Sequence, residues 1–380
     1  MPSLTEFLAT KELFYKDIDY DYFPNLWKRI EHKFKIPKIV HIVGTNGKGS
    51  TGRFLAWYLY RAKKRVGHYS SPHILDFSER IWLDGSDVDR VSLELAHQSL
   101  YKKLDQNDIK RLSYFEYTTL LAIEVFKELE YVVLEAGLGG EFDATNVFEK
   151  LFSLITPIAK DHESFLGNSL KEIATTKLRS VSTFAIMATQ KDEVYKVADE
   201  LKIEWYKSEE FFNKDEKDRI KEFIKENNFA SYLEENLTLA LSGVKKLGIK
   251  IDFDFLNGIE LKGRFERFSK NIIIDVGHNA LGAKAIKNEL KDKKITLIYN
   301  TYKDKDFKKI FEILKENIEE VLIIDVENER ILKREILEKF LKEEKIPYES
   351  FSPKLLKASK SYLVFGSFVV VERFLKEVGL

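Results

Sequence analysis

The sequence predicts an α/β protein of two domains, each built on a mainly parallel sheet. Short runs of aliphatic and β-branched residues recur along the chain, and helix-length amphipathic segments separate most of them. With 380 residues, of which 44% are hydrophobic, the chain has more apolar material than one core comfortably holds. Alternation of this kind is typical of parallel strands whose connecting helices cover both faces of the sheet.

The first part of the chain supplies five strand-like runs, each bounded by turn residues. They are residues 38–43, 65–70, 131–135, 152–156 and 183–188. A helix-rich stretch from about 216 to 259 follows and ends in the polar, glycine-containing segment LNGIELKGRFERF. We therefore predict a larger domain over residues 1–264.

The alternation of strand and helix patterns restarts after that segment. Strand-like runs lie at 271–276, 294–299, 320–325 and 361–365, and each except the last is followed by a clear helix pattern. These elements predict a second, smaller α/β domain over residues 265–380.

Composition and charge exclude several classes of function. Lys plus Arg and Asp plus Glu are both 62, so no basic excess exists to drive binding to nucleic acid. The absence of cysteine excludes disulfides, thiolate nucleophiles and thiolate zinc sites. The N-terminus has no apolar signal region, and no stretch approaches the ~20 apolar residues of a membrane helix. We expect a cytoplasmic protein without nucleic-acid or membrane partners.

The strongest local signal is VHIVGTNGKGSTGRFLAWYLY, in which a buried strand runs through a glycine-rich loop into an amphipathic helix. Glycines let successive backbone N–H groups point into one concavity, and the helix N-terminus and Lys48 add positive charge. Gly49 separates Lys48 from Ser50, which departs from the usual phosphate-loop spacing. The alternative is a glycine-rich turn with an exposed lysine. The candidate nucleotide-binding residues are Gly44, Thr45, Asn46, Gly47, Lys48, Gly49 and Ser50.

Three further side chains follow predicted strands and are candidates for holding a metal ion. Ser71 follows the second run, Glu135 ends the third before a glycine-rich loop, and His162 follows the fourth, next to Asp161. The carboxyl ends of parallel strands meet at one edge of the sheet, where ligands bind, and a carboxylate there suits Mg²⁺ on phosphate. The alternatives are a capping hydroxyl for Ser71, a surface acid for Glu135 and a structural histidine for His162.

Taken together, these segments resemble folylpolyglutamate synthase and dihydrofolate synthase, members of the Mur ligase superfamily. The resemblance runs from about residue 20 to the C-terminus and implies a Mur-ligase-like ATP-binding domain followed by a Rossmann-like domain. Its motifs are GTNGKGS at 44–50, SSPHILDFSERI at 70–81, LSYFEYTTLLA at 112–122, LEAGLGGEFDATN at 134–146, KDHESFLGNSLKEIATTK at 160–177, KGRFER at 262–267, DVGHNALG at 275–282 and VFGSFVVVERFL at 364–375.

The resemblance implies an ATP-dependent, magnesium-requiring ligase. Such an enzyme adds L-glutamate to dihydropteroate, to tetrahydrofolate polyglutamate, or to both, through an acyl phosphate. The implied cofactors and substrates are ATP, Mg²⁺, dihydropteroate, folates and L-glutamate, and the implied oligomeric state is a monomer. Phe115 and the loop at 73–80 are candidates for lining the acceptor pocket.

The resemblance also implies roles for residues of the first domain. Lys48 would contact the β- and γ-phosphates, and Ser71, Glu135 and His162 would bind Mg²⁺. Lys177 would match a lysine that is carbamylated, although the family usually continues with Ala-Gly-Ile where this chain has Leu-Arg-Ser.

Four further residues are implied by the resemblance. Asn236 lies in the helix on the adenine side, and the usual His-Gln pair before it is replaced here by Tyr232 and Leu233. A side-chain contact is thereby lost and must be supplied otherwise. Arg264 would reach phosphate from between the domains, and Asp275 with His278 would border ATP and the incoming glutamate. The candidate catalytic residues are Lys48, Lys177, Asp275 and His278.

Other interpretations of the sequence remain open. A Mur-type amide ligase could take a different acceptor, although a cell-wall ligase needs an N-terminal nucleotide-sugar domain and only 43 residues precede Gly44. A P-loop ATPase or kinase would explain Lys48 and Glu135 but not a second domain bearing Asp275 and His278. A catalytically silent nucleotide-binding module is a third alternative.

Overall fold

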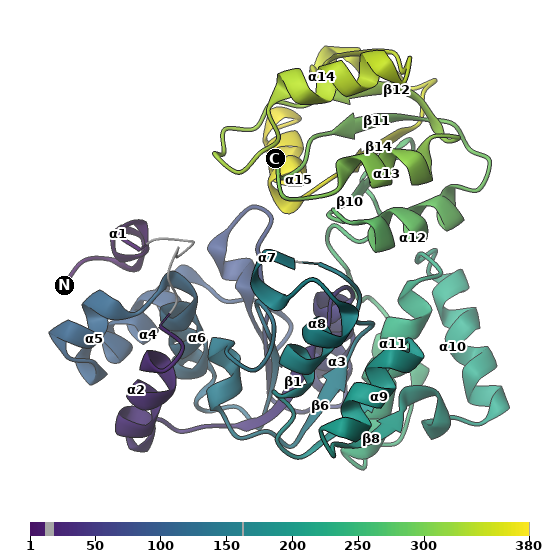
Figure 1. Ribbon diagram of the computed structural model, residues 1–380. Coiled ribbons are helices and arrows are strands. Elements are labelled where there is room, and N and C mark those ends of the chain that lie inside the picture. The colour runs from purple at the N-terminus through teal and green to yellow at the C-terminus, as the bar shows by residue number, and fades with distance from the viewer. Residues whose placement is uncertain (12–18, 162, 380) are drawn as a thin grey trace. The chain divides into compact units, whose positions relative to one another are not determined.

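The structure is a computed structural model that describes residues 1–11, 19–161 and 163–379 (Figure 1). The chain divides into two compact units. The first consists of Met1–Phe223 and Glu234–Ile259, and the second of Ile224–Leu233 and Glu260–Leu380. The short segment 224–233 therefore belongs to the second unit although the first unit surrounds it in sequence.

The first unit is built on an eight-stranded sheet with the order β4-β3-β2-β5-β1-β6-β7-β8. The pairs from β2 to β8 are parallel, whereas β3 and β4 form an antiparallel edge that was not predicted. The strands are β1 Lys38–Val43, β2 Val66–Tyr69, β3 Ile81–Leu83, β4 Ser86–Asp87, β5 Tyr131–Glu135, β6 Phe152–Ile155, β7 Phe184–Met187 and β8 Glu204–Lys207.

Helices cover both faces of this sheet, as predicted. Val43 and Ile155 pack against α8 and α9, whereas Leu154 points to the opposite face and lies against Gly243 of α11. The helices are α1 Leu4–Ala9, α2 Tyr22–Ile30, α3 Lys48–Arg61, α4 Arg90–Lys103, α5 Gln106–Arg111, α6 Tyr114–Phe126, α7 Glu163–Leu166, α8 Leu170–Leu178, α9 Asp192–Glu200, α10 Lys214–Glu226 and α11 Leu233–Lys246.

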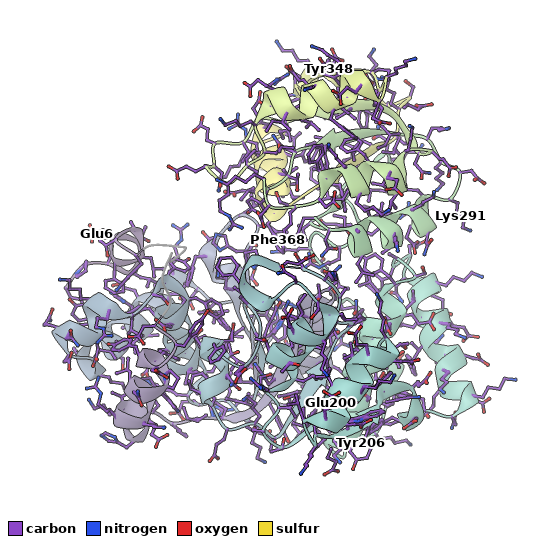
Figure 2. All side chains as sticks on the ribbon, in the orientation of Figure 1. Glu6, Glu200, Tyr206, Lys291, Tyr348 and Phe368 are labelled. Atoms are coloured by element: carbon purple, nitrogen blue, oxygen red, sulfur yellow. The ribbon has the colours of Figure 1, made fainter. Side chains whose placement is uncertain are left out.

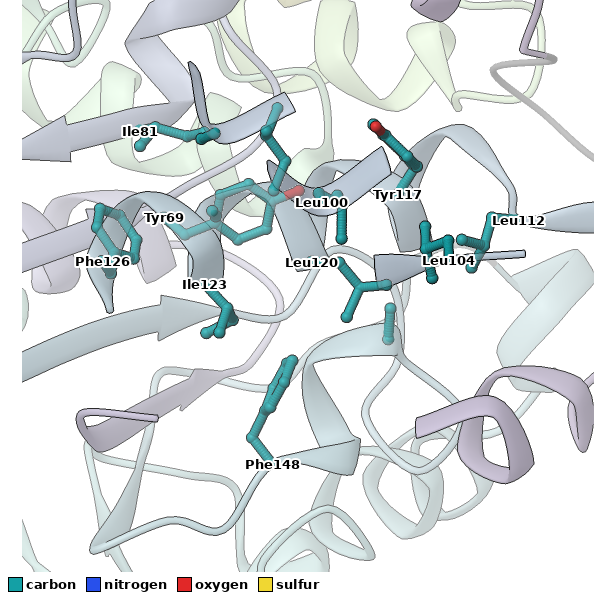
Figure 3. Packing of buried hydrophobic residues seen from close by; sticks show 14 of the residues in the cluster. Tyr69, Ile81, Leu100, Leu104, Leu112, Tyr117, Leu120, Ile123, Phe126 and Phe148 are labelled. Carbon is teal, nitrogen blue, oxygen red and sulfur yellow. The ribbon is translucent and has the colours of Figure 1, made fainter. Parts of the chain in front are cut away.

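A large apolar cluster fills the space between the sheet and helices α2, α4 and α6. Figure 3 shows part of this cluster, to which Tyr69, Leu120 and Phe126 belong; all three side chains are fully buried. Leu134 of β5 belongs to the same cluster. Because successive strand residues point to opposite faces, Glu135 is directed to the other face of the sheet, where α3 lies.

The second unit is built on a six-stranded sheet with the order β13-β12-β11-β14-β10-β9. Only β9 is antiparallel to its neighbour among the described strands. The elements are β9 Glu266–Arg267, β10 Ile272–Asp275, α12 Ala280–Leu290, β11 Ile295–Tyr299, α13 Phe307–Leu314, β12 Ile318–Ile323, α14 Arg334–Glu343, β13 Tyr348–Ser350, β14 Tyr362–Phe365 and α15 Phe368–Glu377. The predicted fold class, two mainly parallel α/β domains, is confirmed.

Helix α15 follows the last parallel strand, where the sequence showed no clear helix pattern. Three consecutive valines favour a strand by local propensity. Ser367 nevertheless caps the helix, because its hydroxyl accepts a hydrogen bond from Val370 N at 3.3 Å, and Val370, Val371 and Phe374 are fully buried. Tertiary packing therefore outweighs the local preference. Phe368 opens this helix (Figure 2).

No helix in the described ranges is both long and apolar enough to cross a membrane.

Candidate functional site

The glycine-rich loop of the first unit connects β1 to α3. Gly44 has φ +151°, and a Cβ there would lie 1.9 Å from Thr156 Oγ1. Gly47 has φ +90°, and a Cβ there would lie 2.3 Å from Asn236 Oδ1. Side chains at either position would therefore clash and strain the backbone. The loop is held between the end of β6 and helix α11, which places Asn236 directly beside it.

Lys48 and Ser50 bring polar groups to the start of α3. The Lys48 Nζ lies 3.4 Å from Gly44 O and 3.3 Å from Thr45 O, so its side chain folds back over the loop. The Ser50 hydroxyl is buried and has no hydrogen-bond partner among the described residues. Gly49 lies in the first turn of the same helix. Backbone N–H groups, a lysine and an unsatisfied hydroxyl at a helix N-terminus suit a polyphosphate and its cation.

Glu135, at the end of β5, lies near Lys48, the first residue of α3, because α3 follows β1 and β1 pairs with β5. β1 and β5 are paired in parallel with Ile42 opposite Glu135, and α3 packs on both β1 and β5. The buried Glu135 Oε1 lies 3.9 Å from Lys48 Nζ. A buried carboxylate beside the phosphate loop is the type of ligand that magnesium prefers.

Lys177 reaches the same loop from α8. Its Nζ donates a hydrogen bond to Gly44 O at 2.8 Å, and the residue is buried. Burial, reinforced by the positive charge of Lys48, lowers the pKa of Lys177 to about 7, although Asp161 and Asp143 act in the opposite direction. Near neutral pH a large share of this amine is therefore uncharged, and an uncharged amine is a nucleophile.

The predicted magnesium ligands are only partly described. Ser71 follows β2, which pairs in parallel with β5, so its hydroxyl belongs to the same sheet edge as Glu135. His162 lies outside the described residues. Across residues 1–11, 19–161 and 163–379, no three His, Asp or Glu side chains are grouped to hold one metal ion. The complete magnesium site therefore stays a prediction.

A buried polar network beneath the loop after Glu135 was not predicted. Asp143 accepts hydrogen bonds from Leu138 N at 2.8 Å and from Thr145 Oγ1 at 2.6 Å. Thr145 Oγ1 lies 2.8 Å from His41 Nε2 on β1. Burial raises the pKa of Asp143. The Asp-x-Thr spacing that forms this turn is visible in the sequence, but the contact with His41 depends on the fold.

Asp275 lies at the end of β10 in the second unit and organises the backbone around it. Its Oδ2 accepts hydrogen bonds from the Tyr232 hydroxyl at 2.9 Å and from Phe265 N at 2.8 Å. Its Oδ1 accepts one from Gly277 N at 2.7 Å. Burial raises the pKa of Asp275, although Arg264 and these hydrogen bonds oppose the shift.

Arg264 and His278 flank that carboxylate in sequence and have separate local contacts. The Arg264 guanidinium lies 5.3 Å from the centre of the Phe368 ring, and its Nη1 donates to Gly263 O at 3.2 Å. His278 Nδ1 lies 3.2 Å from Val276 O.

The structure thus brings Lys48, Glu135, Lys177 and Asn236 together around the loop of the first unit, and Tyr232, Arg264 and Asp275 together in the second.

Comparison with known proteins gives full-length similarities. No family model matches the chain. A dihydrofolate synthase/folylpolyglutamate synthase of Buchnera aphidicola subsp. Acyrthosiphon pisum is 30% identical over 369 residues, which span 89% of this chain and 88% of that protein. Another of that name from Haemophilus influenzae is 29% identical over 349 residues, 80% of this chain and 78% of that protein.

Solved structures agree over almost the whole chain. The crystal structure of Helicobacter pylori folylpolyglutamate synthetase is 40% identical, with a TM-score of 0.79 and coverage of 99% of this chain and 97% of that one. The bifunctional folylpolyglutamate synthase/dihydrofolate synthase of Yersinia pestis, complexed with AMPPNP and a Mn ion, is 25% identical. Its TM-score is 0.83, with coverage of 100% and 99%.

Proposed function

Because the chain belongs to the dihydrofolate synthase/folylpolyglutamate synthase family, we propose that it is a bifunctional ATP-dependent ligase that joins L-glutamate to dihydropteroate and to tetrahydrofolate. The observation that carries the proposal is the loop of the first unit. Lys48, Glu135 and Lys177 all converge on it, and its two positive-φ glycines let it pack closely against Thr156 and Asn236.

The chemistry requires activation because an ionised carboxylate resists attack by an amine. An oxygen of the acceptor carboxylate attacks the γ-phosphorus of ATP, and the bond to the bridging oxygen breaks to release ADP. The glutamate amine then forms a bond to the carbonyl carbon of the acyl phosphate, phosphate leaves, and the amine loses a proton. Lys48 and the backbone N–H groups of the loop stabilise the negative charge on phosphate through the first step.

Magnesium fits the polar groups beside the loop. The Ser50 hydroxyl is buried without a partner in the described parts of the chain, and Glu135 supplies a buried carboxylate. Ser71 and His162 are proposed as further ligands. A similar protein binds Mn ion with AMPPNP, which supports a divalent ion with ATP here. Such an ion supplies positive charge to the phosphate oxygens.

We propose that Lys177 is carbamylated. Its uncharged Nζ forms a bond to the carbon of CO₂ and loses a proton, which converts a buried amine into a carboxylate. Burial and the pKa of about 7 favour the uncharged amine that this step requires. The resulting carboxylate would lie close to the phosphate loop and could help to hold a metal ion.

The remaining site residues are also proposals. Asn236 is proposed for the adenine side, and Arg264, Asp275 and His278 for binding ATP and glutamate. For the acceptor, Phe115 packs against Gly137, where a Cβ would lie 2.6 Å from the ring. In the loop at 73–80, Arg80 Nε donates to His73 Nδ1 at 2.8 Å. A cytoplasmic monomer is proposed as well.

The test is glutamate-dependent ADP release by purified protein with ATP and Mg²⁺, with dihydropteroate and tetrahydrofolate supplied separately. Turnover with both acceptors is expected. Turnover with one acceptor would restrict the activity to that one. ADP release that does not depend on glutamate or acceptor would favour the ATPase alternative, and no ADP release despite measured ATP binding would refute the ligase.

A further inference from the structure

We propose that Tyr232 is a positioning residue that fixes the direction of Arg264 through Asp275. The expected loss of activity rests on the proposed function, whereas the expected loosening of the backbone at Phe265 does not. A single carboxylate oxygen, Asp275 Oδ2, joins the Tyr232 hydroxyl at 2.9 Å to the Phe265 N–H at 2.8 Å. Tyr232 is therefore linked through one atom to the backbone directly after Arg264.

The turn that carries Arg264 is strained and needs such a link. Phe265 has φ +50°, a left-handed backbone conformation that bulky residues rarely adopt. Three hydrogen bonds hold the turn: Phe265 N to Asp275, Val276 N to Gly263 O at 3.0 Å, and Gly263 N to Glu266 Oε2 at 2.6 Å. Weakening of the Asp275 contact would let Phe265 relax, and Arg264 would then leave its place over Phe368.

Tyr232 is one of the donors that hold the Asp275 carboxylate, which also faces the positive charge of Arg264. An ionised carboxylate has about four acceptor sites, and three hydrogen bonds to Asp275 are present, from Tyr232, Phe265 and Gly277. The tyrosine is the only side-chain donor among these three. Burial keeps the phenol protonated by raising its pKa well above the usual value.

A second contact fixes the segment that bears Tyr232. Ser231 N donates to Glu289 Oε1 at 2.6 Å, and the Ser231 hydroxyl also donates to that oxygen. Glu289 lies in the last turn of α12, the helix that follows the loop with His278. Two neighbouring residues therefore tie the segment 224–233 to the second unit, which gives Tyr232 a fixed approach to Asp275.

The experiment compares wild type with Tyr232→Phe, which removes only the hydroxyl. The matched control is Tyr362→Phe, because the Tyr362 hydroxyl bonds Lys357 N and Leu355 O at the opposite end of the sheet from Asp275. We expect the kcat of glutamate-dependent ADP release to fall about ten- to hundredfold in Tyr232→Phe, which is the range for loss of a hydrogen bond to a charged group. The kcat of the control variant should change little.

The pH profile and a double-mutant cycle distinguish a role of Tyr232 in positioning Arg264 from a general loss of folded structure. Loss of a donor to the ionised form raises the pKa of Asp275, so the acidic limb of the rate profile should move to higher pH in Tyr232→Phe alone. In an Arg264→Ala background, Tyr232→Phe should cause little further loss. The proposal would be overturned if the acidic limb of the pH–rate profile stayed in place and the losses in kcat of the two single variants were fully additive in the double variant.

Amide hydrogen exchange gives a test that needs no turnover. The Phe265 amide should exchange faster in Tyr232→Phe than in wild type or in Tyr362→Phe, with unchanged melting as a check on folding. Equal exchange in all three proteins overturns the inference even if the enzyme is active. If wild type lacks activity but Phe265 exchange responds as expected, the proposed function fails and the structural link stands.

Discussion

Replacement of Lys177 by methionine should change how the stability of the first unit depends on pH. The pKa of Lys177 is lowered from 10.5 to about 7, and each tenfold change in proton affinity corresponds to about 1.36 kcal/mol. The charged amine therefore costs the folded state about 5 kcal/mol at low pH. Methionine has a similar length and no charge, so the variant lacks this cost.

The direction of this pH dependence follows from the number of protons bound in the folded and unfolded states. Between pH 7 and 10.5 the unfolded lysine holds a proton that the folded one has lost, so the free energy of unfolding rises with pH over that window. From pH 6 to pH 9 the wild type should gain about 3 kcal/mol relative to Lys177→Met. Lys150, also buried, has a pKa lowered to about 8, so Lys150→Met should show about half that difference.

Urea unfolding followed by tryptophan fluorescence can measure this difference. The four tryptophans, at positions 27, 57, 82 and 205, all lie in the first unit, which also contains Lys177. CO₂-free buffers keep the amine unmodified. If the stability difference between wild type and Lys177→Met is the same at pH 6 and pH 9, Lys177 does not have a lowered pKa, and its amine is not uncharged near neutral pH.

Three further predictions concern the same loop. With ¹³C-labelled bicarbonate, a carbamate signal should appear by NMR in wild type and Lys150→Arg and vanish in Lys177→Arg; a signal that survives in Lys177→Arg would contradict the assignment. Gly47→Ala should weaken ATP binding, measured by calorimetry, by roughly tenfold or more. The control is Gly248→Ala, at φ +76° with no atom within 4 Å of its Cβ, which should leave ATP binding unchanged. Equal effects of the two changes would show that the loop does not bind the nucleotide. Glu135→Gln should raise the Mg²⁺ concentration for half-maximal ADP release about tenfold, and an unchanged Mg²⁺ dependence would exclude it as a ligand.

The buried strands were predictable from sequence, whereas the edge strands were not. The strands β1 and β5 match the predicted runs at both ends because most of their residues are aliphatic or β-branched and almost all are buried. The strands that were not predicted, β3, β4, β8, β9 and β13, have two to four residues each and lie at or next to the sheet edges. Such short segments show no periodicity, and their pairing depends on neighbours that are brought together only by the fold.

The candidate site was predictable where its residues lie in local motifs and not where they meet only through the fold. Lys48, Glu135 and Asp275 lie at strand or helix ends within recognisable motifs, so their placement follows from the sheet. For Tyr232 the sequence predicted only that a contact was lost. The structure pairs Tyr232 with Asp275, 43 positions away, and no local pattern specifies a partner at that separation.

The discontinuous second unit bears on any attempt to dissect this protein into fragments. A fragment of residues 260–380 would contain Asp275 and Glu289 but would lack Ser231 and Tyr232. Its Asp275 carboxylate would be deprived of a donor, and the Glu289 side chain would lose its contacts with Ser231. Truncation at the apparent boundary therefore yields an incomplete module, and autonomous expression should require the peptide 224–233 to be fused to the second unit.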